Sequence, residues 1–250
     1  MTRKIPCYVL VYDQFSIIKR SIDFLCGYST RLDIIVIENP SSNTPQISAY
    51  IRRQARKGYI KRYYLFDNNI ANNAFATVLE NDWLSLIRSK HVLITDGDLV
   101  CRDQSWLDEE LSILERWRVF ACGISLSLDN LPLKTFPDAK AWVPAASAET
   151  DRYYIGKTGI HLLMMRSFYL LLFMLWRRLT RVHFIDDRMH YFCDHILRMS
   201  WARTKKTQAS HLTWDLYANN KHPYTRMKSR LDFADIWRTS RESGFSVEKY

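Results

Sequence analysis

The first 125 residues alternate between short apolar segments rich in strand-forming residues and longer segments whose apolar residues recur at helical spacing. The apolar segments are almost continuously hydrophobic, which is typical of parallel strands buried on both faces of a sheet. The alternation therefore predicts an α/β fold, a mainly parallel sheet flanked by helices. Strands are expected at residues 7–12, 32–38, 60–66 and 91–95. Helices are expected at residues 16–27, 46–57 and 74–88.

The rest of the chain is less regular. Residues 105–117 predict a helix with Ser105 as its N-cap, and residues 119–128 predict a strand. A long loop over residues 129–157 is expected to be functional, since loops of that length are uncommon in compact domains. Further elements are a strand at residues 159–165, an apolar helix from Ser167, a helix beginning near Asp194, and a polar tail with weak helical character after Ser229. With 250 residues and 47% hydrophobic residues, the chain predicts a single domain, residues 1–250.

Polar residues follow each of the four early strands. They are Tyr12 and Asp13, Glu38 and Asn39, residues 67–69, and Asp96, Gly97 and Asp98. The carboxyl ends of parallel strands meet on one rim, where ligands of such sheets bind. The pair Asp96 and Asp98 supplies oxygen ligands that suit Mg²⁺ or Mn²⁺. Taken alone, the motif is better explained by an Asp-Gly turn, whereas its position after the fourth strand favours a metal site.

The net charge, the cysteine content and the N-terminal sequence indicate the kinds of partner and the cellular compartment to expect. The net charge of +10 suits an anionic partner, which includes nucleic acid, a phosphorylated small molecule and an acidic membrane surface. The five cysteines are scattered without a C-x-x-C pair, so reduced thiols are expected and a zinc site is not. The N-terminus leads directly into a strand without a secretory leader, so a cytoplasmic location is expected.

Six segments resemble the GT-A glycosyltransferases, and most closely the inverting family 2 enzymes. These segments are IPCYVLVYDQFSIIKRSIDFL, LDIIVIENPSSNT, LFDNNIANNAF, HVLITDGDLVCRDQSWLDEEL, TGIHLLMMRSF and FIDDRMHYFCDHILRM. The resemblance covers residues 5–213 and is strongest around the D-x-D pair. It implies the GT-A fold, with a nucleotide-sugar-binding half over residues 1–127, an acceptor and catalytic half over residues 128–216, and a basic tail over residues 217–250 that closes as a lid.

The resemblance also implies ligands. The donor is a nucleotide-diphospho-sugar, with a UDP-sugar as the first expectation, and the metal is Mn²⁺ or Mg²⁺. The implied metal ligands are Asp96, Asp98 and the late residue His211. The implied donor-binding residues are Tyr12, Asp13, Glu38, Asn39, Asn69, Asp96 and Gly97.

By the same resemblance, Asp194 is the base that deprotonates the acceptor hydroxyl, at a helix start where the helix dipole would keep it ionised. Family members usually carry an acidic pair there, whereas this chain has Cys193 before Asp194. An ordinary helix N-cap is the structural alternative for Asp194. Asp186 and Asp187 are competing candidates for the base.

Several side chains have two interpretations each. Trp142, Tyr153 and Tyr154 either stack on an acceptor sugar or pack the long loop. In the tail, basic residues either neutralise the leaving diphosphate or form a solvated face; they are Lys221, His222, Arg226 and Lys228. The apolar run at residues 168–176 is too short to span a bilayer, so it is either a core helix or a helix lying on a membrane.

The predicted function is therefore inverting transfer of a sugar to a hydroxyl of a glycan or lipid-linked saccharide. An inactive glycosyltransferase-like binding module is the alternative, since Cys193 replaces an acid. A sugar-phosphate nucleotidyltransferase is disfavoured because VYDQFSIIKR lacks the glycine-rich loop that such enzymes need. A nucleic-acid-binding protein is also disfavoured, because the basic residues are dispersed and no nucleic-acid-binding motif is found.

Overall fold

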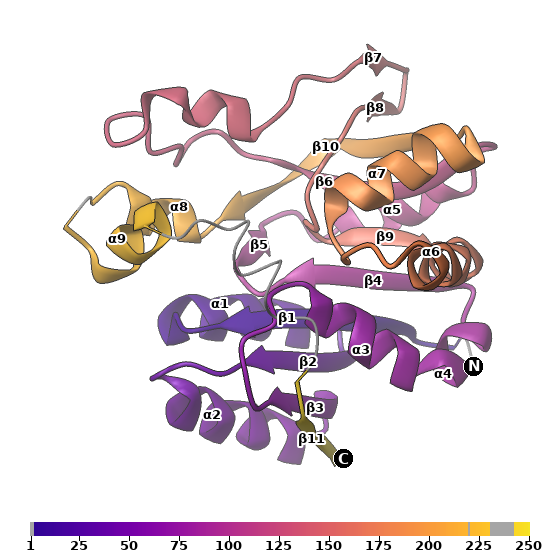
Figure 1. Ribbon diagram of the computed structural model, residues 1–250. Coiled ribbons are helices and arrows are strands. Elements are labelled where there is room, and N and C mark those ends of the chain that lie inside the picture. Colours follow the sequence, from indigo (N-terminus) through magenta and orange to yellow (C-terminus); the bar gives the residue numbers. More distant parts are fainter. Residues whose placement is uncertain (1–2, 220, 231–242) are drawn as a thin grey trace.

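The computed structural model describes residues 3–219, 221–230 and 243–250. Its centre is one sheet of eleven strands in the order β11-β3-β2-β1-β4-β9-β6-β10-β8-β7, with β5 paired to β10 (Figure 1). Strands from both halves of the chain belong to this sheet, so the two expected halves share one scaffold.

The described strands and helices have the following bounds. The strands are β1 (Ile5–Tyr12), β2 (Leu32–Asn39), β3 (Ile60–Phe66), β4 (His91–Asp96), β5 (Leu99–Cys101), β6 (Val119–Leu126), β7 (Ala148–Glu149), β8 (Tyr153–Ile155), β9 (Leu163–Arg166), β10 (Ser200–His211) and β11 (Phe245–Lys249). The α-helices are α1 (Phe15–Cys26), α2 (Thr44–Arg56), α3 (Asn73–Asn81), α4 (Trp83–Ile87), α5 (Trp106–Leu114), α6 (Ser167–Thr180), α7 (Asp186–Tyr191), α8 (Thr213–Tyr217) and α9 (Pro223–Arg230). A 3₁₀ turn, η1, covers Pro137–Trp142, and a π-helical turn, η2, covers Phe192–Leu197.

The expected parallel strands are confirmed. Strand β1 lies between β2 and β4, β3 pairs with β2, and all three pairings are parallel. Alternate residues of β1 point to opposite faces: Cys7, Val9 and Val11 join one buried cluster, whereas Tyr8 and Leu10 join the other. Both faces are covered, which explains why these strands are almost continuously apolar.

The sheet as a whole is mixed rather than mainly parallel. Strand β9 lies antiparallel between β4 and β6, β8 is antiparallel to β10, and β11 is antiparallel to β3. After the long loop the chain re-enters the middle of the sheet instead of extending its edge. Hydrophobic content alone does not encode the direction in which such a strand runs.

The helix expected at residues 74–88 is interrupted at Asp82, between α3 and α4. The Asp82 carboxylate is buried and accepts hydrogen bonds from Arg62 Nη1 (2.5 Å), Tyr64 Oη (2.8 Å) and Tyr8 Oη (3.3 Å). Its hydrogen-bond partners lie on β1 and β3. The helix is therefore interrupted at a residue that bonds to distant strands, although the sequence pattern of this segment is continuously helical. Ser105 precedes α5, yet its hydroxyl donates to Asp103 rather than capping the helix.

The prediction that a helix begins near Asp194 is wrong. Helix α7 begins at Asp186 and passes directly into η2, so Asp194 lies inside the π-helical turn and is exposed. Asp194 therefore does not benefit from the dipole of a helix N-terminus. Asp186 and Asp187 occupy that first turn instead.

Helix α6 confirms the apolar helix from Ser167. It buries Leu170, Phe173 and Met174 against the sheet, whereas its outer side is exposed. Within the described residues, every helix is either too short or too polar to cross a bilayer.

Candidate functional site

The polar ends of β1, β2 and β3 meet on one rim, as predicted. Tyr12 is hydrogen-bonded to the Asn69 side chain, and Asn43 Nδ2 donates to Asp13 Oδ1 at 3.1 Å. Asp13 has a φ of 64°, a left-handed conformation in which its carboxylate also accepts from Gln14 Nε2 at 2.6 Å. Asn39 joins the same rim to the following loop, because it binds the Ala71 carbonyl at 3.2 Å and the Ile70 amide at 3.2 Å. These hydrogen bonds connect the loops that follow β1, β2 and β3.

Glu38 does not face this rim as an open donor-binding carboxylate. It is fully buried and accepts a short hydrogen bond from Tyr63, whose hydroxyl also lies 2.6 Å from Ser48 Oγ. Burial raises the pKa of Glu38, against the opposing effect of the Tyr63 hydrogen bond. This placement contradicts the expectation that Glu38 is open to a nucleotide base.

The turn Asp96-Gly97-Asp98 packs tightly against β1. The Gly97 amide donates to the Leu10 carbonyl at 2.7 Å, and the Asp96 amide donates to the Ile160 carbonyl at 3.0 Å. A β-carbon at position 97 would lie 2.6 Å from Val11 Cγ1 and 3.0 Å from the Leu10 carbonyl oxygen. The glycine therefore permits close approach to the neighbouring strand, and this approach positions the two carboxylates.

Asp98 and His211 are brought together by the antiparallel pairing of β5 with the end of β10, in which His211 faces Leu99. His211 Nδ1 lies 3.4 Å from Asp98 Oδ2, and the Thr213 hydroxyl donates to the same oxygen at 2.5 Å. The other oxygen, Asp98 Oδ1, is buried without a hydrogen-bond partner. The family resemblance implied that Asp98 and His211 share a metal, whereas no sequence pattern marked Thr213.

Aromatic rings hold His211 from two sides. The Trp214 ring stacks on it with a centroid separation of 4.9 Å, and the His161 ring meets it edge-on at 5.5 Å. Burial, followed by the nearby His211, lowers the pKa of His161 to about 3, so His161 is a neutral imidazole at physiological pH. His161 was not predicted, because a single histidine near an apolar strand usually has a structural role.

The donor set fits a hard or borderline divalent cation. An orphaned carboxylate oxygen at Asp98 and the imidazole of His211 suit Mn²⁺, and Asp96 lies in the same turn. Among the described residues, no group of three or more His, Cys, Asp or Glu side chains is arranged to hold a metal. Mg²⁺ and Mn²⁺ at phosphate sites usually take one or two carboxylates, with the remaining ligands from substrate phosphates and water.

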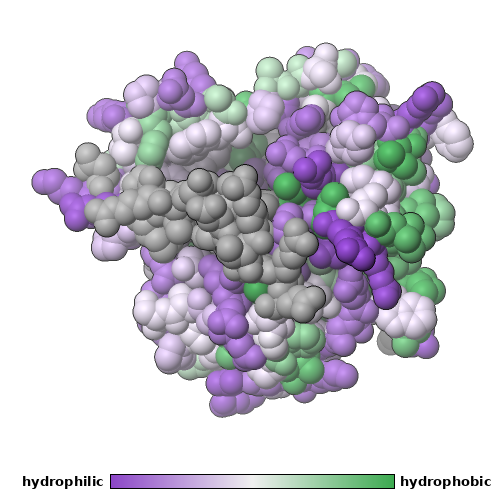
Figure 2. Space-filling model, in the orientation of Figure 1, coloured by the Kyte–Doolittle hydropathy of each residue, from purple (hydrophilic) through white to green (hydrophobic). Residues whose placement is uncertain are grey.

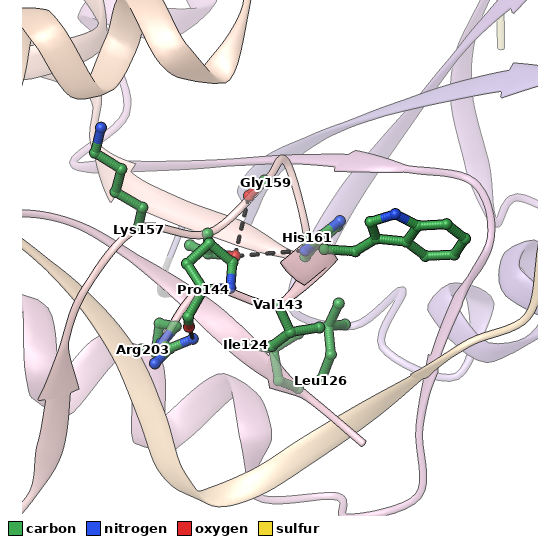
Figure 3. A pocket seen from close by; sticks show the side chains of 10 residues that line it. Ile124, Leu126, Val143, Pro144, Lys157, Gly159, His161 and Arg203 are labelled. Carbon is green, nitrogen blue, oxygen red and sulfur yellow. Dashed lines mark hydrogen bonds between the residues drawn. The ribbon is translucent and has the colours of Figure 1, made fainter. Parts of the chain in front are cut away.

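His161 also lines a pocket (Figure 3). It is lined by Ile124, Leu126, Trp142, Val143, Pro144, Lys157, Thr158, Gly159, His161 and Arg203. Arg203 is 9% exposed and donates to the Pro144 carbonyl at 2.8 Å, while the Lys157 amino group points away from the pocket. Of the three aromatic residues predicted to meet an acceptor, Trp142 lines this pocket; Tyr153 and Tyr154 lie on β8.

The first described part of the tail lies near the strand-end rim, whereas its last residues form β11 beside β3. Tyr224 of α9 is buried, and its raised pKa results first from burial and then from Tyr217, Asp98, Asp13 and Tyr12. Lys221 and Arg226 are exposed and His222 is half-buried. The Lys228 side chain lies outside the part of the chain that the structure describes. Helical character was predicted after Ser229; α9 ends at Arg230, and the residues that follow, 231–242, are not described.

The candidate bases differ in their surroundings. Asp194 is exposed, beside Cys193 and close enough to His190 to influence its pKa. Asp186 is half-buried; burial and then Asp187 raise its pKa, and the pocket residue Lys157 opposes the rise. The charge of Lys157, which lines the pocket, therefore acts on the carboxylate of Asp186.

The chain was also compared with known proteins. No profile of a known protein family matches it. It is 42% identical over 249 residues to "Uncharacterized protein L137" of Acanthamoeba polyphaga mimivirus, covering 98% of this chain and 34% of that protein. It is 40% identical over 231 residues to "Uncharacterized protein L142" of the same virus, covering 90% of this chain and 47% of that protein. The chain thus spans less than half the length of these relatives.

Solved structures share the architecture. The mannosyltransferase PcManGT from Pyrobaculum calidifontis, in complex with GDP-Man and Mn²⁺, matches with a TM-score of 0.54 and 15% identity, over 84% of this chain and 57% of its own. GalNAc-T7 with UDP, GalNAc and Mn²⁺ matches with a TM-score of 0.51 and 7% identity, over 83% of this chain and 43% of its own. The chain therefore has the GT-A fold of these glycosyltransferases.

Proposed function

We propose that this protein is a metal-dependent glycosyltransferase that moves a sugar from a nucleotide-diphospho-sugar to a hydroxyl of a glycan or lipid-linked saccharide, with inversion. The observation that carries the proposal is the contact between Asp98 and His211, at the carboxyl ends of parallel strands in a GT-A fold. Fold alone does not determine activity, so the argument depends on this site.

The donor is assigned to the rim beside this pair. Asp98 and His211 would hold Mn²⁺ or Mg²⁺, with Asp96 as a further ligand or a partner of the ribose. The bound metal would stabilise the charge of the departing diphosphate. Tyr12, Asp13 and Asn69 would contact the nucleoside, while Asn39 orders the loop beneath it. The two similar solved structures hold GDP-Man or UDP together with Mn²⁺, which supports a nucleotide donor, and a UDP-sugar is our first choice.

The pocket beside His161 is assigned to the acceptor, with Trp142 as a wall for a sugar ring. Asp194 is our proposed base on the strength of the family resemblance. Asp186 is the competing assignment, because it is half-buried near Lys157 and has a raised pKa, which suits proton abstraction near neutral pH.

The test is release of nucleoside diphosphate from a panel of nucleotide-sugars, with Mn²⁺, with Mg²⁺ and with a chelator. We expect metal-dependent release from one donor, lost in Asp98→Ala and retained in the control Asp33→Ala, which lies at the opposite end of β2. Donor binding without release for any acceptor would favour the inactive module. Absence of nucleotide-sugar binding, with salt-sensitive binding of RNA or DNA, would refute the proposal.

A further inference from the structure

Helices α4 and α6 expose a group of large apolar side chains that the proposed chemistry does not use. We call this group the α4–α6 patch. Its members are between 50% and 76% exposed: Trp83, Leu84, Ile87, Phe168, Leu175 and Leu179. Single exposed apolar residues are common on protein surfaces, whereas a group of six on two neighbouring helices marks an interaction site.

The two helices place these side chains on one surface. Helix α4 packs against α6, and Phe168, Leu175 and Leu179 recur at helical spacing along the outer side of α6. In Figure 2, apolar side chains gather at the right-hand edge of the molecule, where Figure 1 shows α6 and α4. Trp176, at the end of the apolar run over residues 168–176, does not join the patch, because it is half-buried and its ring stacks on that of Tyr191 at a centroid separation of 6.0 Å.

The chain around the patch is basic. Neither α4 nor α6 contains an acidic residue. Arg88 and Lys90 follow α4, and Arg178 and Arg181 lie at the end of α6; all four are exposed. The acidic residues that precede α4 are already paired, Glu80 with Arg177 at 3.1 Å and the buried Asp82 with Arg62 at 2.5 Å, and the first acidic residues after α6 are Asp186 and Asp187 in the first turn of α7.

We propose that the α4–α6 patch docks on an anionic membrane surface, with its apolar side chains among the lipid headgroups and its four cations against the phosphates. An apolar face flanked by Arg and Lys is the composition of interfacial helices, and each such cation adds attraction to anionic lipid. A second copy of this chain is a poorer occupant, because a two-fold contact would bring the same basic residues together. The proposal does not depend on the transferase activity.

The test is co-sedimentation of the protein with vesicles of phosphatidylcholine alone and of phosphatidylcholine mixed with phosphatidylglycerol. We expect binding to the anionic vesicles, weakened by added salt, and little binding to the neutral ones. The double variant Leu175→Ser, Leu179→Ser should lower the partition coefficient at least about tenfold, since two apolar anchors are lost. The variant Arg178→Gln, Arg181→Gln should also lower it, and should reduce its dependence on salt.

The control is Trp117→Ser, which removes an apolar side chain that is 88% exposed and lies after α5. It should leave vesicle binding unchanged, and thermal melts should show that all variants fold. Equal binding to neutral and anionic vesicles would overturn the proposal, as would binding unaffected by the leucine substitutions. Absence of vesicle binding together with self-association that the leucine variant abolishes would identify a second copy as the occupant instead.

Discussion

His211 Nδ1 lies 3.4 Å from Asp98 Oδ2, although the two residues belong to opposite halves of the chain. The pairing of β5 with the end of β10 creates this contact, and Thr213 fixes the carboxylate by donating to the same oxygen. Both neighbours contact Oδ2, and the other carboxylate oxygen, Asp98 Oδ1, has no hydrogen-bond partner. An unpaired buried carboxylate oxygen is costly, and a bound cation would offset that cost.

The first prediction concerns metal affinity. Asp98→Asn and His211→Ala should each weaken Mn²⁺ binding by about 10- to 100-fold, because each removes one of the few proposed metal ligands. Electron paramagnetic resonance of free Mn²⁺ would measure this directly, with and without UDP. Asp33→Asn serves as the control, and undiminished Mn²⁺ affinity in both site variants would exclude the proposed metal site.

The second prediction separates the candidate bases. If Asp194 is the base, Asp194→Asn should lower kcat by about 10²- to 10⁴-fold while donor affinity stays constant, and Asp186→Asn should have a much smaller effect. Single-turnover transfer and UDP-sugar binding would be measured on the same preparations. The opposite pattern would transfer the role to Asp186, and two active variants would place the base elsewhere.

The third prediction concerns the glycine of the D-x-D turn. Gly97→Ala should destabilise the fold by about 1–3 kcal/mol, because the new methyl group would overlap Val11 and the Leu10 carbonyl. Gly58→Ala is a contrasting variant: nothing lies near its added carbon, but its φ is +80°, so its cost is backbone strain rather than overlap. In chemical denaturation both should lose stability, but only Gly97→Ala should also weaken Mn²⁺ binding. Normal Mn²⁺ affinity in that variant would show that the turn tolerates the displacement.

The fourth prediction concerns the buried carboxylate between α3 and α4. Asp82→Asn should destabilise the protein by about 2–4 kcal/mol, since it removes the charge that satisfies Arg62 and two tyrosine hydroxyls. Glu80→Gln is a matched control, because its ion pair with Arg177 is half-exposed and should contribute less than about 1 kcal/mol. Urea unfolding of both variants would test this difference, and equal effects would contradict it.

The fifth prediction concerns Glu110, a residue of α5 whose side chain is completely buried. Neither of its carboxylate oxygens has a hydrogen-bond partner. Burial raises the pKa of Glu110 well above that of an unfolded chain, so folding favours the protonated form. The contribution of Glu110 to stability should therefore decrease as the pH rises above the unfolded-state pKa of 4.5. Glu110→Gln should remove that decrease and be more stable than the wild type near neutral pH.

The measurement is the melting temperature of wild type and Glu110→Gln across the range from mildly acidic to mildly basic pH. Exposed Glu115 provides the control Glu115→Gln, which should follow the wild-type pH profile. Parallel profiles for wild type and Glu110→Gln would mean that Glu110 is not protonated in the folded protein.

Local patterns were sufficient for much of the first half. The period of apolar residues determined β1 to β4 and the first two helices between them, because burial on both faces requires continuous apolar strands. It also placed Tyr12, Asp13, Asn39 and Asp96 on one rim, since parallel strands align their carboxyl ends. Asp98 and His211 were paired only through resemblance to a known fold, not through any local pattern.

Other features depended on contacts between distant segments. The hydrogen bond between buried Glu38 and Tyr63, the break at Asp82 and the antiparallel course of β9 involve partners from separate elements. The proximity of His161 to His211 has the same origin. Residue type and periodicity determined which segments become strands and helices, because these follow from local backbone preference and burial. Which polar groups become buried, paired or exposed was decided only by the tertiary structure, because desolvation depends on neighbours that the chain brings together on folding.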